Sequence, residues 1–88
     1  MIVAAAIRQG EKVYALPAPA RHHDIIHYLH RIGVGYNHDP DDQGFIDSNH
    51  GYVRRAPALA IVRHEEQPLR DGKQKPDHER LLFSEDLW

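Results

Sequence analysis

The feature that most constrains the fold is the apolar run Ile2–Ile7, which contains no charged residue. Its length suits one β-strand, and it ends at Arg8, so it is far too short to cross a bilayer as a helix. A turn at Gly10 and roughly alternating polar and apolar residues in Lys12–Leu16 follow. The two segments predict a β-hairpin whose first strand has a central position in a sheet.

A helix is predicted after the prolines that end this hairpin, from about Ala20 to Ile32. Its isoleucine and leucine residues recur at helical spacing and give one apolar face. Gly33 follows, and glycine readily adopts the left-handed conformation that ends many helices. The same stretch carries four of the eight histidines of the chain, which makes it the first place to look for a binding site.

A second hairpin is predicted from the short strands Phe45–Asp47 and Tyr52–Arg54, joined by the turn Ser48–Gly51. A second helix is predicted from about Arg55 or Ala56 to Glu65. Its proline lies in the first turn, where no helical hydrogen bond is lost.

The remaining segments predict loops and an anchored tail. Residues 37–44 form an acidic, turn-rich loop, and the polar residues 67–80 predict a mobile loop. Residues 81–83 predict an anchor on the core, and Ser84 could cap a terminal helical turn. The order β-β-α-β-β-α-tail predicts a single α+β domain, residues 1–88, in which two helices pack on a small antiparallel sheet of two hairpins.

Composition limits the classes of partner. The net charge of the 88-residue chain is -2 with neutral histidines, whereas proteins that bind long DNA or RNA usually carry a basic surplus. The absence of cysteine excludes disulfides and thiolate metal sites. We expect a soluble cytoplasmic protein without a membrane partner. Its core is small, so we also expect a homodimer or higher homo-oligomer, which would bury further apolar surface.

The cluster Arg21, His22 and His23 stands next to the start of the predicted first helix. Free backbone N–H groups and the positive end of the helix dipole favour an anion there, and the guanidinium fork suits phosphate. The cluster therefore predicts a site for an anion or a phosphorylated ligand. The alternative is a helix face that contacts only water.

Metal binding is another alternative for the histidines. His23, His27 and His30 recur at spacings that place them on one helical face, and Asp24 or Asp39 could complete a site. Three ligands from one helix converge poorly on a tetrahedral centre, however, and no His-Glu-x-x-His pattern occurs. We therefore assign no metal and no cofactor.

Phe45 and Tyr52 are expected to face each other across the second hairpin. Such a pair is most often part of the core, but it could provide a surface on which a nucleobase stacks. Arg54 and Arg55 would then place phosphate donors beside it. Tyr36 is a further free aromatic residue. The two serines lie outside any nucleophile elbow, and no glycine-rich phosphate loop occurs, so no enzyme is expected.

Several motifs occur in an order that resembles a known family. They are IVAAAI in the first strand, RHHDII in the first helix, QGFID and GYVRR in the second hairpin, and LLFSEDLW at the end. Together they resemble the phage anti-Thoeris sponge family. Its members bind the cyclic ADP-ribose signal that bacterial TIR-domain enzymes make, and they hold it without cleaving it.

The resemblance implies an α+β dimer in the cytoplasm of the infected host cell, with the ligand near a subunit interface. By motif, Arg21 would clamp a phosphate and Phe45 would stack on the base. Arg54 or Arg55 would meet the other phosphate or the ribose. The residues expected to bind the ligand are Arg21, His22, His23, Phe45, Arg54 and Arg55.

A different class of function stays open from the residues alone. The acidic residues 39–42 and the tail 85–88 could dock on a host defence enzyme and inhibit it, with Trp88 as an anchor. A histidine-rich metal-binding protein is the third possibility.

Overall fold

The computed structural model describes residues 1–35 and 39–88. Tyr36 and residues 37–38 of the predicted acidic loop lie outside the described residues. Within the described ranges, no helix is long and apolar enough to span a membrane.

The four strands form one antiparallel sheet of order β2-β1-β3-β4. Each predicted hairpin is present, and the two hairpins join through β1 and β3. The central position of the apolar first strand is therefore confirmed. The strands are β1 (Ile2–Gln9), β2 (Lys12–Pro17), β3 (Gln43–Asp47) and β4 (Gly51–Arg54).

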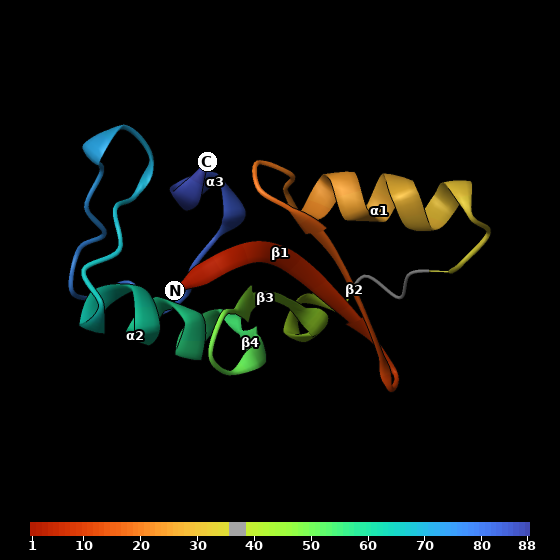
Figure 1. The fold of residues 1–88 in the computed structure, drawn as a ribbon, viewed down its shortest axis with the longest axis horizontal. Helices are drawn as coiled ribbons and strands as arrows, with labels where there is room; N and C mark the ends of the chain where they lie inside the picture. Colours follow the sequence, from red (N-terminus) through yellow and green to blue (C-terminus); the bar gives the residue numbers. More distant parts are fainter. Residues whose placement is uncertain (36–38) are drawn as a thin grey trace.

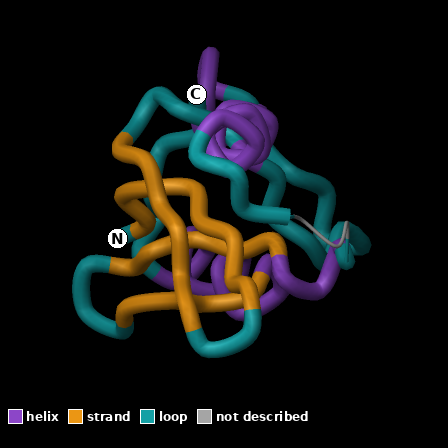
Figure 2. Tube along the Cα trace, turned by 90° about the vertical axis from the view of Figure 1, so that its right-hand side faces the viewer, coloured by secondary structure: helices purple, strands orange, loops and turns teal. Residues whose placement is uncertain are grey.

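Helices α1 and α2 pack on the same face of the sheet. Ala5 pairs with Phe45 across β1 and β3, and Ile7 shares their face because side chains alternate along a strand. These residues form one core with apolar residues of both helices. Figure 1 shows α1 and α2 towards opposite ends of the molecule, and Figure 2 shows the strands gathered on one side. The helical elements are α1 (His22–Arg31), η1 (Pro40–Asp42), α2 (Arg55–His64), η2 (Arg70–Gly72) and α3 (Ser84–Leu87).

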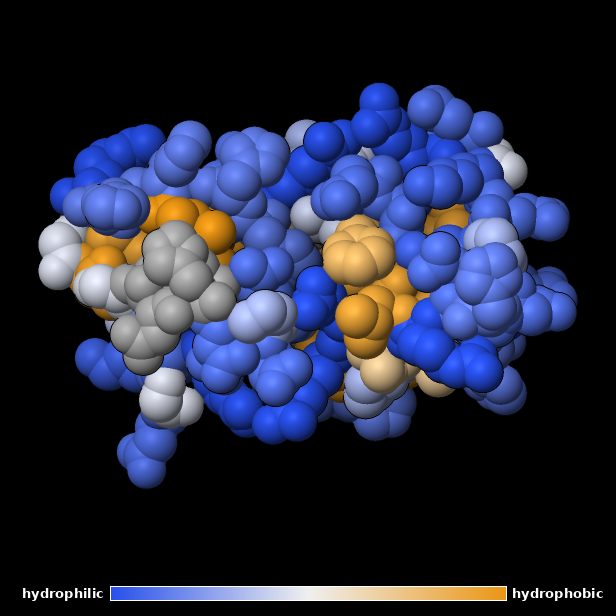
Figure 3. All heavy atoms as spheres, turned by 180° about the vertical axis from the view of Figure 1, so that it is seen from behind, coloured by the Kyte–Doolittle hydropathy of each residue, from blue (hydrophilic) through white to orange (hydrophobic). Residues whose placement is uncertain are grey.

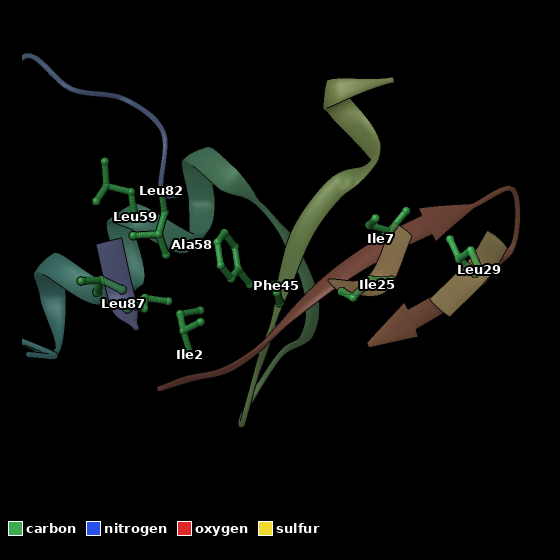
Figure 4. Close-up of a cluster of buried hydrophobic side chains, with 11 residues drawn as sticks. Ile2, Ile7, Ile25, Leu29, Phe45, Ala58, Leu59, Leu82 and Leu87 are labelled. Carbon is green, nitrogen blue, oxygen red and sulfur yellow. The ribbon is translucent and has the colours of Figure 1, made fainter. Parts of the chain in front are cut away.

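Phe45 lies in this core, with no exposed surface. Figure 4 shows its ring next to Ala58 of α2, with Leu82 close by. Leu82 comes from the segment that the sequence predicts to anchor the chain, and it is fully buried. That anchor is confirmed. The α+β arrangement of two hairpins and packed helices is confirmed as well.

The predicted facing of Phe45 and Tyr52 is wrong by one residue of register. Phe45 pairs with Val53, and Tyr52 pairs with Ile46. A shift of one residue moves a side chain to the opposite face, so Tyr52 lies on the face away from the helices. Its ring covers the backbone at Gly44 there.

The buried carboxylate of Asp47 explains this register. Its Oδ2 accepts the N–H groups of Asn49 and His50, each at 3.1 Å, and the His50 Nδ1 lies 2.6 Å away. An aspartate that bonds to backbone N–H groups ahead of it stabilises a tight turn. The connection is therefore shorter than predicted, and Asp47 pairs directly with Gly51.

Candidate anion-binding site

Arg21 precedes α1 and holds the end of the chain against it. Its Nε donates to the main-chain oxygen of Trp88 at 2.7 Å, and the Trp88 indole N–H donates to the Ala20 oxygen at 2.8 Å. Its own N–H donates to a carboxylate oxygen of Asp24 at 2.8 Å. Arg21 thus bonds to groups of the protein itself at the place where the sequence predicts a bound phosphate.

His22 is buried, with 8% of its surface exposed. Its Nε2 lies 2.7 Å from the Gly44 oxygen, and its Nδ1 lies 3.2 Å from the Ser84 hydroxyl. The carbonyl accepts only, so Nε2 carries the proton and the hydroxyl donates to Nδ1. The ring also meets the edge of Phe45, with 5.1 Å between centroids. His22 therefore joins α1, β3 and α3 as a neutral imidazole.

His23 points away from this cluster, and 63% of its side chain is exposed. Its ring lies 6.1 Å from that of His27, and its Nε2 lies 3.4 Å from a carboxylate oxygen of Asp24. In the described part of the chain, no three histidine, aspartate or glutamate side chains gather where a metal ion could bind. The described residues therefore provide no ligand set for a metal site on this helix.

The predicted stacking surface at Phe45 is wrong, because the ring is fully buried between the sheet and α2. A nucleobase could reach it only if the core opened. The structure offers a different aromatic side chain, the half-buried Phe83. The main-chain N–H of Leu82 donates to the Arg55 oxygen at 3.1 Å, and this bond places Phe83 beside the start of α2.

Two cations contact the Phe83 ring. The Arg55 guanidinium carbon lies 5.3 Å from the ring centroid, and the Lys75 ammonium lies 4.9 Å from it. Both distances are within the range of cation–π attraction. The Arg55 guanidinium also donates to the Pro40 oxygen at 3.1 Å, whereas the adjacent Arg54 is exposed. Of the two arginines predicted to bind the ligand, Arg55 is the one that these contacts hold in place.

Asp86 holds the lysines of this site. Lys75 lies 2.7 Å from one carboxylate oxygen and Lys73 lies 3.0 Å from the other. Burial raises the pKa of Asp86, but hydrogen bonds from Lys75, from the Phe83 N–H and from Lys73 together outweigh it and keep the pKa below its usual value. One carboxylate pairs with two ammonium groups, so the three groups together keep a net positive charge. The segment 67–80, expected to be a mobile loop, thus supplies two lysines that pair with Asp86.

A groove of about 640 Å³ adjoins this site between α2 and the segment 67–77, which Figure 1 shows extending at the end of α2. Its volume is within the range common for small-molecule sites, about 300–1,000 Å³. Basic, acidic and apolar side chains all contribute to it. The charged residues that line it are Arg63, Lys73, Lys75, Glu66 and Asp77.

Phe83, Lys73 and Lys75 are functional candidates that sequence reasoning missed. One signal was present: side chains alternate in an extended segment, so Phe83 had to point away from the side on which Leu82 is buried. The lysines carried no such signal, because their position depends on Asp86, eleven or more residues later.

Figure 3 shows the face opposite to that of Figure 1. Hydrophobic residues form separate areas there, and hydrophilic side chains surround them.

The buried His22 predicts a pH dependence of stability. Burial lowers its pKa from 6.5, despite the opposing bond to the Gly44 oxygen. As pH falls below about 6.5, the unfolded chain binds a proton at this position before the folded one does, so stability decreases. The loss cannot exceed about 1.4 kcal/mol per pH unit. Urea unfolding between pH 7.5 and 5.5 would measure it, and His22→Gln should show a smaller decrease than the wild type. Equal decreases would contradict the assignment.

The chain matches a known protein family. No curated protein and no solved structure matches the chain. The family described as phage T4 y16D protein matches residues 1–88. Because that match covers the entire chain, this protein belongs to the phage T4 y16D protein family.

Proposed function

We propose that this phage protein binds a cyclic ADP-ribose or cyclic nucleotide signal, holds it without cleaving it, and so weakens a host defence. The observation that carries the proposal is the Phe83 ring with Arg55 and Lys75 against it. A nucleotide needs cations for its phosphates and a flat group for its base. Arginine planes and aromatic rings both stack on bases, so this site offers both kinds of contact.

The charge at the site supports an anionic ligand. Arg55 donates to the neutral Pro40 oxygen, and none of the ion pairs found among the described residues involves its guanidinium. Lys73 and Lys75 share the single charge of Asp86. An incoming phosphate would therefore meet the Arg55 guanidinium and the positive charge by which the two lysines exceed Asp86. The adjoining groove of about 640 Å³ gives such a ligand room.

Retention without cleavage is the second part of the proposal. Ser84 lies beside a histidine, with its hydroxyl 3.2 Å from Nδ1 of His22. A serine beside a histidine resembles a nucleophile beside its base. Ser84 is only 2% exposed, however, and the Nε2 of His22 is already bonded to Gly44. This pair stabilises the fold and does not face the groove, which supports binding without turnover.

A ligand panel tests the proposal directly. Purified protein would be melted with cyclic ADP-ribose isomers and cyclic nucleotides, with zinc as a control. We expect a higher Tm with one nucleotide, because a ligand that binds only the folded state stabilises it. Recovery of that nucleotide intact after denaturation would establish retention. Recovery of a cleaved product would instead identify an enzyme, and a shift with zinc alone would support a metal protein.

Arg55→Ala should weaken binding of that nucleotide about tenfold or more, since it removes a charge-assisted contact. Arg54→Ala is the matched control, because it removes the same charge from the neighbouring exposed position and should change the affinity less than about threefold. Isothermal titration calorimetry would compare the variants. Equal losses would indicate a general charge effect and contradict a site at Arg55.

The protein-interaction alternative loses one of its supports. Asp86 and Leu87 are buried, and Trp88 is half-buried with its indole N–H bonded to Ala20. The tail therefore packs on its own chain, and Trp88 is not exposed as an anchor for a partner protein. If no nucleotide changed the Tm, a pull-down from host lysate would test the remaining acidic residues 39–42 as a docking surface.

A further inference from the structure

Strand β2 is an edge strand with main-chain groups that point outward. Gln9 and Lys12 pair across the two-residue turn of the first hairpin, so they form a hydrogen-bonded pair, and such pairs alternate along an antiparallel ladder. Tyr14 and Leu16 therefore bond to β1. The N–H and C=O groups of residues 13 and 15 point away from it. Among the described residues, none bonds to these outward groups.

The two edges of the sheet differ in how they are protected. Natural edge strands avoid pairing with other chains through charge, proline or short length. The opposite edge, β4, has four residues and ends at Arg54, next to Arg55. β2 has six, and its lysine and proline lie only at the two ends. Residues 13–16 carry no charge, so the middle of β2 is open to another strand.

A hollow lies beside this strand on the side of α1. It has a volume of about 220 Å³. Two of the exposed large hydrophobic residues border it, Val13 with 42% and Tyr28 with 38% of the surface exposed. The residues that line it are Val13, Tyr14, Ala15, Leu16, Ile25 and Tyr28.

We propose that β2 pairs in antiparallel fashion with β2 of a second copy of this chain, about a two-fold axis at Tyr14. In this register Val13 of each copy lies opposite Ala15 of the other, and their outward N–H and C=O groups form four hydrogen bonds. All the outward groups of these residues are then used, which makes the strand self-complementary. The inference does not rest on the proposed nucleotide site.

Side chains agree with the same register. Residues opposite each other share a face of the sheet, so the Tyr14 side chain of the second copy would enter the hollow beside Tyr14 of the first. Lys12 would lie opposite Leu16, and no like charges would meet. The joined sheet would have eight strands, with β2 at its centre and a hydrophobic seam in place of an exposed edge.

Ala15→Pro tests the proposal, because it removes an outward N–H group and leaves the bonds between β1 and β2 intact. Proline is tolerated at such edge positions. It would delete two of the four bonds between copies, so we expect the dimer dissociation constant to rise about tenfold or more. Ala15→Thr is the control, since it keeps the N–H group and suits a strand. Sedimentation velocity over a concentration series would measure both variants.

Amide exchange of the wild type gives a second measurement that does not require a variant. In the proposed dimer the amides of Val13 and Ala15 exchange slowly, and dilution to monomer makes them exchange fast. A circular dichroism melt would show whether Ala15→Pro is folded. Either a wild type that stays monomeric at every concentration, or a dimer in which these two amides exchange fast, would overturn the proposal.

Discussion

Asp86→Ala is expected to lower the free energy of unfolding by about 3 kcal/mol. The Lys75 side chain is only 7% exposed and that of Asp86 3%, so the substitution leaves an ammonium group without its partner in a poorly solvated place. It also removes the acceptor of the Phe83 N–H at the start of α3. For a domain of this size the Tm should fall by roughly 15 °C, which differential scanning calorimetry would measure.

Two further variants separate the ion pair from a general effect of charge. Glu85→Ala removes an exposed carboxylate from the neighbouring position and should change the stability by less than about 0.5 kcal/mol. Asp86→Leu combined with Lys75→Met should recover much of the loss, because an apolar pair avoids the unpaired charge.

The pH dependence gives an independent check on Asp86. Its folded pKa lies below 3.8, so its contribution is present above the unfolded value and is lost as pH falls through the folded one. The difference between wild type and Asp86→Ala should therefore shrink in acid. A single substitution that costs less than about 1 kcal/mol at pH 7 would refute the role of Asp86.

Gly44→Ala is expected to destabilise the fold by about 2 kcal/mol or more. A Cβ atom at this position would meet the main-chain oxygen of Val53, and it would lie 2.8 Å from the Tyr52 ring. The ring could move, but the Val53 oxygen belongs to β4 and can move only if the strands separate. Urea unfolding of the variant would measure the loss.

Gly35→Ala is the matched control for Gly44→Ala. Among the described residues, nothing lies within 4 Å of a Cβ atom at Gly35, so the stability of this variant should stay within about 1 kcal/mol of the wild type. The double variant Gly44→Ala with Tyr52→Ala would remove the ring from the contact. If that variant recovered fully, the obstruction would be the ring alone, contrary to the expected role of the Val53 oxygen.

Most of the fold could be predicted from local patterns. The apolar run of β1, the turn at Gly10 and the helical spacing of residues 25–32 each depend on neighbours in sequence, and such patterns are reliable guides to element type. Several boundaries differ from the predicted ones by one or two residues; for example, α1 begins at His22 instead of Ala20, β1 ends at Gln9 instead of Ile7, and β3 begins at Gln43 instead of Phe45. Helix ends and strand ends depend on tertiary contacts that local patterns do not contain.

The candidate site was less predictable, because it depends on pairs far apart in the chain. Arg55 was identified from its neighbours in sequence, but its aromatic partner is Phe83, and no pattern links the two. Phe45 was chosen because it was expected to face Tyr52 across the second hairpin and because it lies in the QGFID motif of the resemblance. A register shift of one residue in the hairpin then decided which aromatic ring is buried and which lies on the outer face.

The contacts of segment 81–88 with α1 also determine how this chain folds. Ser84 and Trp88 bond to residues more than sixty positions earlier, and α1 alone, with ten residues, is too short to be stable in water. A stable α1 therefore forms only when segment 81–88 packs against it. Chains dominated by such distant contacts fold more slowly than helical bundles of the same length. The protein should accordingly gain its secondary structure and its tertiary packing in one cooperative step, with no early helical intermediate.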